Sequence, residues 1–371
     1  MRVALVHDWL TGMRGGEKVL DVMCEIFPGA DLFTLVHERG SVAPRIEARR
    51  IVTSALQHVP PARRRYRHFL PIFPWLIEQF DLDGYDLVVS TSHCTAKAVI
   101  PGGRARHISY CFSPMRYAWD QFDSYFGAER VGGVASRYFY GPVLRRLARW
   151  DAATSARVDR FITLSHFVAA RIGRYYNRTA TIVYPPVDTV FYHPDAAATP
   201  ASHFLIVSAL VPYKRIELAI EACRRAGASL RIVGDGPDRS RLERLAGADV
   251  TFLGWLTDEE VREEYRRAAA VLLPGEEDFG IVPLEAQACG RPVVARACGG
   301  ALETVLDDDT GILVANGNAE SWADALTRCR ARTFDPARLR AHAERFSREH
   351  CVARMKAVIA ETVEAPSGQR W

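Results

Sequence analysis

The chain has 371 residues, which is long enough for two domains of ordinary size. Hydrophobic residues make up 48% and charged residues 25%, the balance of a globular protein, and the net charge is only +4. No run of about 18 apolar residues predicts a membrane span, and MRVALVHDWLTG lacks the long apolar region of a signal peptide. The eight cysteines are scattered singly, which is typical of small buried side chains in a reducing cytoplasm.

The first half of the chain alternates between strand and helix patterns. A turn and a helix pattern, EKVLDVMCEIF (17–27), follow the first apolar run. Continuous apolar runs of this kind are typical of parallel strands covered by helices on both faces. The expected strands lie within residues 2–10, 32–36, 49–53, 85–93, 105–113 and 160–167.

A linker separates the halves at residues 184–202, where Pro, Ala, Asp and Thr are frequent and no periodicity is visible. Strands are then expected within 203–210, 230–237, 250–256, 270–275, 292–298 and 311–315, with helices at 216–227 and 239–247. Thr257 and Glu260 spell a capping box, and a long helical stretch runs from about 335 to 364. The prediction is an α/β protein of two doubly wound domains facing across a cleft.

The segment GEEDFGIVPLEAQACG (275–290) places two carboxylates at the edge of an apolar region. Glu277 is expected on a strand-to-helix loop and Glu285 one turn into the helix. Free amides at the start of that helix favour an anion such as a phosphate. Carboxylates beside a phosphate would accept hydrogen bonds from sugar hydroxyls, which suits a nucleotide sugar. The alternative is that both acids merely stabilise the helix start.

The spacing Glu-x7-Glu, followed by EAQACGRPV, resembles the signature of retaining family 4 glycosyltransferases of the GT-B fold (glycosyl transferases group 1). SALVPYKRIELAIEA (208–222) resembles the phosphate-binding segment of that family, and HDWLTGMRGGEKVL (7–20) resembles its glycine loop. ISYCFSPMRYAWD (108–120) resembles the mannosyltransferase branch that builds bacterial surface polysaccharides. The resemblance implies a first Rossmann-like domain at 1–185 for the acceptor and a second at 186–345 for the nucleotide sugar. A final helix, about 346–371, would pack back on the first domain.

The resemblance also implies roles for individual residues. Lys214 would contact the donor diphosphate, Glu277 the transferred sugar and Glu285 the ribose. We expect Glu277, Lys214 and His93 at the catalytic centre, although a histidine at a strand end is more often structural. The expected donor-binding residues are Gly15, Gly16, Lys214, Arg215, Gly234, Trp255, Leu256, Glu277, Phe279, Gly280, Ile281, Val282 and Glu285.

Two positions depart from the family pattern. Ala209 stands where the family usually has an arginine that clamps the diphosphate, and Phe112 stands where many members have a histidine. Arg215 or an arginine of the N-terminal domain is a candidate substitute for the missing arginine. For retention, two inversions would need a carboxylate nucleophile, and Asp8 and Asp120 are the unsupported candidates. Same-face attack needs diphosphate stabilisation and positioning. No metal and no cofactor is expected, since the run Asp307 to Asp309 is interpreted as a solvated turn.

Basic and aromatic residues are interleaved in PPARRRYRHFLPIFPWL (60–76). Such a segment suits an anionic membrane surface, and its alternative is a solvated helix start followed by core aromatics. No nucleic-acid partner is expected, because no known binding module accompanies it. The residues expected to meet the acceptor or the membrane are Arg63, Arg64, Arg65, Arg67, Trp75, Arg116, Tyr117 and Trp119.

The sequence therefore predicts a retaining glycosyltransferase that moves mannose from GDP-mannose to a polyprenyl-diphosphate-linked oligosaccharide, in exopolysaccharide or O-antigen synthesis. Its expected location is cytoplasmic, on the inner face of the cell membrane. UDP-linked sugars, a nucleotide-sugar epimerase or phosphorylase, and a non-catalytic sugar-binding partner of a polysaccharide synthase stay open as alternatives.

Overall fold

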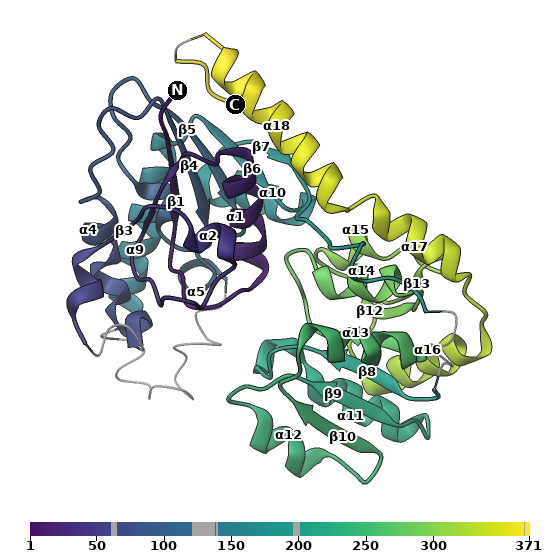
Figure 1. Cartoon of the computed structure of the whole chain (residues 1–371). Helices are drawn as coiled ribbons and strands as arrows, with labels where there is room; N and C mark the ends of the chain where they lie inside the picture. Colours follow the sequence, from purple (N-terminus) through teal and green to yellow (C-terminus); the bar gives the residue numbers. More distant parts are fainter. Residues whose placement is uncertain (61–64, 121–137, 139, 196–200, 367) are drawn as a thin grey trace. The chain divides into compact units, whose positions relative to one another are not determined.

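The computed structural model describes residues 1–60, 65–120, 138, 140–195, 201–366 and 368–371, which form two compact units (Figure 1). Unit 1 comprises Met1–Pro186 together with Cys351–Trp371, and unit 2 comprises Val187–His350. The division follows Pro186, one residue beyond the expected boundary, and the end of the chain returns to unit 1.

Unit 1 is built on a parallel sheet whose described strands have the order β3-β2-β1-β4-β5-β6-β7. Strand β1 is buried along its length, so its sequence is continuously apolar rather than alternating. The strands are β1 (Val3–His7), β2 (Asp31–Thr34), β3 (Ile51–Thr53), β4 (Leu87–Ser92), β5 (Arg106–Cys111), β6 (Arg160–Thr163) and β7 (Ala180–Ile182).

Helices cover both faces of this sheet. The α-helices of unit 1 are α1 (Gly15–Ile26), α2 (Pro44–Glu47), α4 (Phe73–Ile77), α5 (Arg116–Trp119), α9 (Gly141–Thr154) and α10 (His166–Tyr176). Its 3₁₀ helices are η1 (Ala55–His58), η2 (Tyr66–Ile72), η3 (Ala96–Ala98) and η5 (Ser155–Arg157). Helices α4 and α9 share one hydrophobic core with β1, β2 and β4, and Figure 1 shows α1 on the opposite side of the sheet.

Unit 2 is built on a second parallel sheet, with the order β10-β9-β8-β11-β12-β13 among its described strands. The strands are β8 (Phe204–Val207), β9 (Leu230–Val233), β10 (Val250–Gly254), β11 (Ala270–Leu273), β12 (Val293–Arg296) and β13 (Gly311–Val314). Both sheets therefore reverse their strand order once, β1 beside β4 in unit 1 and β8 beside β11 in unit 2. In open α/β sheets ligands bind beyond the carboxyl ends of the strands at such a switch point.

The helices of unit 2 form two cores, one on each face of its sheet. Helices α11 (Ile216–Arg225), α12 (Arg239–Leu245) and α16 (Ala319–Ala331) contribute to one core. The other core contains residues of α13 (Asp258–Arg267), α14 (Ile281–Ala288), α15 (Ala301–Thr304) and α17 (Pro336–Glu344). The predicted capping box of α13 is confirmed, since the Glu260 amide donates to Thr257 Oγ1 at 3.3 Å and the Thr257 amide donates to Glu260 Oε2 at 2.8 Å.

The predicted helical stretch 335–364 is divided into two helices. Helix α17 ends at Glu344 and α18 (Arg348–Glu364) begins after three intervening residues. The intervening backbone pairs with the linker instead: the Phe346 carbonyl accepts the Val187 amide at 3.0 Å, and Val187 accepts the Arg348 amide at 3.2 Å. The distal part of α18 belongs to unit 1, where Glu361 lies 2.9 Å from Arg160.

Two sequence expectations concern the cysteines and membrane-spanning helices. None of the eight cysteines, all of which lie in the described part of the chain, is in a disulfide, and seven of them are buried. Within the described residues, every helix is too short or too polar to cross a membrane.

Candidate functional site

The switch point of unit 2 brings together two loops that the sequence singled out. One loop leaves β8 and ends in the short 3₁₀ helix η6 (Pro212–Lys214), and the other leaves β11 and leads into α14. Because β8 and β11 are neighbours, the loops meet although they lie about 60 residues apart in sequence. Lys214 and Glu277 are therefore brought to one place.

Lys214 and Glu277 form an ion pair through Nζ and Oε1, and each side chain is 17% exposed. Gly275 makes this approach possible: a Cβ there would lie 2.7 Å from Lys214 Cα. The pair is thus held by the backbone as well as by charge, with one cation and one carboxylate at the mouth of the switch point.

Close backbone contacts fix the loop that carries Glu277. The Gly300 amide donates to the Glu277 carbonyl at 2.8 Å. A Cβ on Gly299 would lie 2.4 Å from that carbonyl oxygen, and one on Gly300 would lie 2.2 Å from Phe279 Cα. Gly280, which precedes α14, has a φ of 92°, a value that favours glycine. The start of α14, with Ile281 and Val282, is therefore presented in a fixed orientation.

Glu285 is buried in α14, where Tyr265 donates from its hydroxyl to Oε2 at 3.0 Å. Burial, together with the nearby carboxylate, raises the pKa of Tyr265 well above its usual range, so the tyrosine stays protonated. Tyr265 orients the carboxylate that the resemblance assigns to ribose.

The remaining expected donor-binding residues of unit 2 differ in how far their side chains are exposed. Gly234 has a φ of 118°, and a Cβ on it would lie 2.0 Å from the Ser208 carbonyl oxygen, so this loop also requires glycine. Trp255, after β10, is 83% exposed, whereas Leu256 packs against the core. Phe279 is buried, with its ring 5.8 Å from that of Phe346, so only its backbone can serve at the loop surface.

Arg215 stands beside Lys214 in a left-handed conformation with a φ of 54°. Its Nε donates to Glu217 Oε1 at 2.9 Å. The substitution of the missing family arginine by Arg215 would require this contact to be exchanged for a phosphate.

The switch point of unit 1 lies between β1 and β4. Gly15 and Gly16 begin α1, and the Arg14 amide donates to Glu17 Oε2 at 3.0 Å. A Cβ on Gly16 would lie 3.4 Å from the Phe112 ring, which shows how closely the glycine loop packs on the end of β5. Glu17 Oε1 lies 3.5 Å from His7 Nε2, and this contact keeps the pKa of the glutamate low despite burial.

Asp8 is fully buried directly after β1. Its carboxylate accepts the amides of residues 93, 94, 95 and 96 at 2.6–3.0 Å. With its oxygens engaged in this way, Asp8 is a structural anchor and does not suit the role of a nucleophile. Asp120, the other candidate, pairs with Arg171 and Tyr175.

His93 follows β4 and is one-third exposed. Its Nδ1 lies 3.2 Å from Asp8 Oδ2, and its ring meets the Trp9 ring edge-on at 4.4 Å. Burial lowers the pKa of His93, and the Asp8 charge opposes that shift. His93 therefore lies at the switch point with its ring held on two sides.

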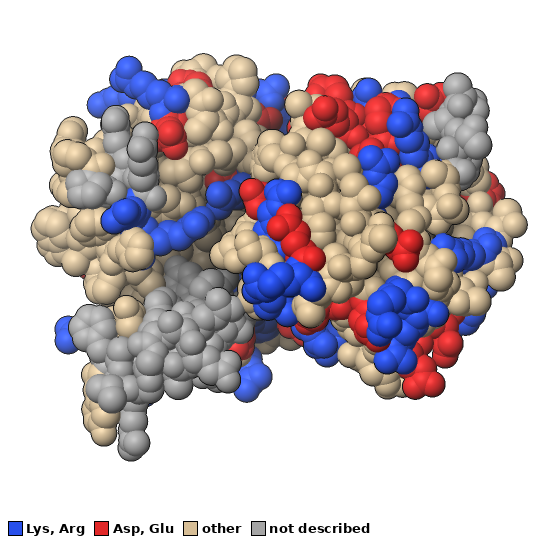
Figure 2. Space-filling model, turned by 90° about the horizontal axis from the view of Figure 1, so that it is seen from below, with Lys and Arg blue, Asp and Glu red and all other residues tan. Residues whose placement is uncertain are grey.

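The arginine–aromatic segment (60–76) divides into inward and outward residues. Tyr66 and Phe73 pack on Trp9, with ring centroids 4.9 and 6.2 Å away, so the core-aromatic interpretation holds for these two. Arg65, Arg67 and Trp75 are exposed, Trp75 by 60%. Arg63 and Arg64 lie outside the described residues. Figure 2 shows a face of the molecule on which basic and acidic side chains are intermixed.

The segment MRYAW lies against the interior of unit 1. Trp119 Nε1 donates to Asp151 Oδ2 at 2.8 Å, and its ring stacks on Tyr175 at 4.6 Å. Arg116 is half-buried, and the side chain of Tyr117 lies outside the described part of the chain. Trp119 is thus a packing residue whose acceptor contact would have to use the exposed part of its ring.

A cluster that the sequence did not point to lies below this segment. Lys97 and Asp151 are both buried, with Nζ 3.0 Å from Oδ1. Lys97 also donates to the Asp151 carbonyl at 2.6 Å, and Tyr176 donates to Asp151 Oδ2 at 2.8 Å. Only the presence of a lysine between two alanines in an apolar run could have drawn attention to it.

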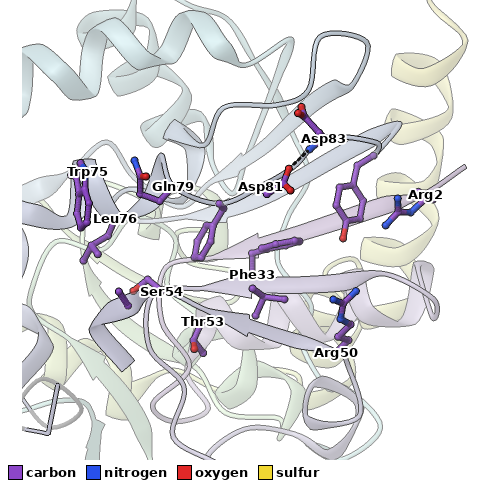
Figure 3. Close-up of a pocket in the computed structure, with 14 residues that line it drawn as sticks. Arg2, Phe33, Arg50, Thr53, Ser54, Trp75, Leu76, Gln79, Asp81 and Asp83 are labelled. Carbon is purple, nitrogen blue, oxygen red and sulfur yellow. Dashed lines mark hydrogen bonds between the residues drawn. The ribbon is translucent and has the colours of Figure 1, made fainter. Parts of the chain in front are cut away.

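Figure 3 shows a pocket of about 590 Å³ in unit 1 that the sequence also missed. Arg2 and Arg50 lie at one end and Trp75 and Leu76 at the other, with Phe33 between them. The pocket follows strands β2 and β3 and contains no residue of either switch point. It is a separate, mixed polar and aromatic surface of unit 1.

The aspartate run at 307–309 is engaged by arginines. Asp308, with a φ of 62°, lies 2.9 Å from Arg332, and Asp309 lies 3.0 Å from Arg338. Asp307 accepts the Leu313 amide at 2.8 Å. The run is a turn fixed by these contacts.

Comparison with known sequences shows similarity to a glycosyltransferase family in the second half of the chain. Residues 196–346 match the family described as Glycosyl transferases group 1. D-inositol 3-phosphate glycosyltransferase of Mycobacteroides abscessus is 37% identical over 195 residues, which cover 47% of this chain and 42% of that protein. The protein of the same name from Saccharomonospora viridis is 33% identical over 228 residues, which cover 52% of this chain and 53% of that protein. The chain thus spans about half the length of the curated relatives it matches.

Solved structures resemble the whole chain in fold. HepE of Anabaena, in complex with UDP, superposes with a TM-score of 0.71 and 16% identity, covering 97% of this chain and 100% of that one. Sucrose-phosphate synthase of Thermosynechococcus elongatus gives a TM-score of 0.69 at 19% identity, covering 97% and 99%. The chain therefore has the GT-B fold of two Rossmann-like domains, and its residues 196–346 are similar to the Glycosyl transferases group 1 family.

Proposed function

We propose that the protein is a retaining glycosyltransferase that binds a nucleotide sugar in unit 2. The observation that carries the proposal is the Lys214–Glu277 pair at the β8–β11 switch point, inside the Glycosyl transferases group 1 match and beside the start of α14. A sugar diphosphate offers anions to Lys214 and hydroxyl donors to Glu277. When a sugar diphosphate separates Lys214 from Glu277, it would therefore give each side chain a new partner of suitable charge or hydrogen-bonding type.

The mechanism proposed is same-face attack. Lys214 and the amides at the start of α14 stabilise the charge that develops on the leaving diphosphate, and this phosphate takes the acceptor's proton. The two-inversion route lacks support in unit 1, because Asp8 is committed to backbone amides and Asp120 to Arg171 and Tyr175. In this mechanism Lys214 and the α14 amides stabilise the diphosphate without a metal ion.

For the donor we propose GDP-mannose, on the resemblance of residues 108–120 to the mannosyltransferase branch. A UDP-linked sugar is the second candidate, supported by the UDP complex of HepE. The relatives named D-inositol 3-phosphate glycosyltransferase offer a soluble acceptor as the alternative to a lipid-linked oligosaccharide. The lipid-linked acceptor and a location on the inner membrane face rest on the exposed Arg67 and Trp75 of the arginine–aromatic segment.

A panel of donors tests the activity. Purified protein should bind one nucleotide sugar more tightly than the others and hydrolyse it slowly without acceptor, equally well in excess chelator. Binding without hydrolysis or transfer would favour the non-catalytic partner of a synthase. Turnover that requires inorganic phosphate or changes only the sugar's configuration would favour a phosphorylase or an epimerase.

Glu277 and Glu285 should fail in different ways when each is changed to alanine. Glu285→Ala should weaken free nucleotide and nucleotide sugar alike, because its carboxylate, oriented by Tyr265, is assigned to ribose. Glu277→Ala should spare free GDP or UDP and weaken only the sugar donor. Calorimetric titration of both ligands measures the split. Equal losses of free-nucleotide affinity in the two variants would contradict it.

The arginine–aromatic segment should guide unit 1 to anionic membranes. Serine at Arg63, Arg64, Arg65 and Arg67 should release the protein from anionic vesicles, since each basic residue near such a surface contributes about 1 kcal/mol. Serine at the exposed Arg224, Arg225, Arg244 and Arg328 of unit 2 removes the same charge and is the control. Vesicle sedimentation at increasing salt measures the effect. Equal vesicle binding by the two variants would mean that the segment is not the docking surface.

A further inference from the structure

The unit 1 switch point contains an aspartate and a histidine that the proposed diphosphate chemistry does not use. Asp8 follows β1 and His93 follows β4, and these strands are paired in register from Val3 with Leu87 to His7 with Thr91. Asp8 accepts the His93 amide at 2.7 Å and the Thr95 and Ala96 amides at 2.6 and 2.8 Å. Such a set of amide donors fixes the position of the carboxylate.

The same carboxylate faces one of the two nitrogens of the His93 ring. Nδ1 lies 3.2 Å from Asp8 Oδ2, so the tautomer protonated at Nδ1 is favoured. Nε2 then presents a lone pair, and among the described residues it has no hydrogen-bond partner. Asp8 is fully buried, while the His93 side chain is one-third exposed. The edge-on contact with Trp9 holds the ring plane.

Burial lowers the pKa of His93 despite the two carboxylates that face it. Burial is the main cause that lowers its pKa, and His7 and Arg67 act in the same direction. Asp8 and Glu17 act in the opposite direction without reversing it. Near neutral pH the ring is therefore a fixed hydrogen-bond acceptor at the carboxyl end of the sheet, where ligands of such sheets bind.

We propose that His93 contacts the substrate by accepting a hydrogen bond at Nε2 from a sugar hydroxyl, and that Asp8 is the residue that positions it. This inference rests on the proposed function, which supplies a sugar as ligand. The hydroxyl belongs either to the transferred sugar or to the acceptor sugar, and both present the same O–H donor. No proton is transferred in this contact. The hydrogen bond orients the sugar, and no covalent bond is formed or broken at His93.

Two variants of His93 and one control test the proposal. His93→Ala removes the acceptor and should lower kcat/KM about ten- to hundredfold, as loss of an oriented hydrogen bond does. His93→Gln keeps an acceptor atom that cannot be protonated and should lose less. His58→Ala changes an exposed histidine of the same unit and should leave activity unchanged. Unfolding midpoints of all three should stay close to that of the original protein.

The pH profile separates contact with substrate from a structural role. Protonation turns Nε2 from an acceptor into a donor, so kcat/KM of the original protein should fall as pH drops below the ordinary pKa of histidine. This acid limb should disappear in His93→Gln. An acid limb unchanged in His93→Gln, or His93→Ala within threefold of the original activity, would overturn the proposal.

Donor hydrolysis without acceptor identifies the source of the hydroxyl. If the transferred sugar provides the hydroxyl, hydrolysis and transfer should fall together in His93→Ala. If the acceptor provides it, only transfer should fall.

Phe112→His offers a rescue experiment. Ser92 and Cys111 are register partners on β4 and β5, and the residues that follow them, His93 and Phe112, have ring centroids 6.3 Å apart. His93→Ala with Phe112→His should regain part of the lost activity. A protein that neither transfers nor hydrolyses any nucleotide sugar would refute the proposed function, and this inference with it, whereas an active protein with the unchanged acid limb refutes the inference alone.

Discussion

Replacing Lys214 with alanine is expected to lower turnover at least about a hundredfold, as removal of one donor to a developing anion does. Lys214 is the cation at the β8–β11 switch point, and the family's usual arginine is replaced by Ala209. The diphosphate therefore depends on Lys214 more strongly than it would if residue 209 were the family's arginine. Steady-state transfer with saturating acceptor measures the loss.

The control for this change is Lys356→Ala, which alters an exposed lysine of α18 and should leave turnover unchanged. Lys214→Arg keeps the charge, but a planar guanidinium would replace a compact ammonium beside Glu277, so intermediate activity is expected. Turnover of Lys214→Ala within threefold of the original protein would remove Lys214 from the catalytic centre.

Replacing Lys97 with methionine is expected to reduce the free energy of unfolding by about 3–5 kcal/mol. Methionine has a similar volume, so the loss comes from leaving Asp151 buried without its cation. Trp119 and Tyr176 still donate to Asp151, but neither neutralises its charge. Urea unfolding followed by fluorescence measures the change.

A second substitution shows whether the uncompensated charge is the cause. Lys97→Met with Asp151→Asn removes both charges, while the amide oxygen can still accept from Trp119 and Tyr176. This double variant should be more stable than Lys97→Met alone, and Lys356→Met should be neutral. A double variant less stable than Lys97→Met would contradict the role given to charge.

Much of unit 2 could be predicted because its signals are local in sequence. Glu277, Glu285 and the start of α14 lie within a short stretch, where a strand pattern ends, a glycine follows and a helix pattern begins. The parallel strands could be predicted for the same reason, since their apolar runs are continuous. The meeting of Lys214 with Glu277 follows from the resemblance and from strand order, and neither sequence segment alone implies it.

The arrangement of unit 1 could not be predicted from local patterns. Asp8 is 85 residues from His93, and the two meet only because β3 is followed by a crossover that returns the chain to β1. Lys97 and Asp151 are joined in the same way across 54 residues. The break between α17 and α18 likewise depends on the linker residue Val187, because no proline or glycine marks it in the sequence.

The discontinuity of unit 1 has a consequence for the order in which the units fold during synthesis. Unit 2 is complete once the ribosome has released residue 350, whereas unit 1 still lacks Cys351–Trp371. Until then β6 lacks the contacts that Arg160 makes with Glu361 and with the Val358 carbonyl at 3.3 Å. The last contacts of unit 1 can therefore form only after every residue of unit 2 has been synthesised, although unit 1 begins the chain.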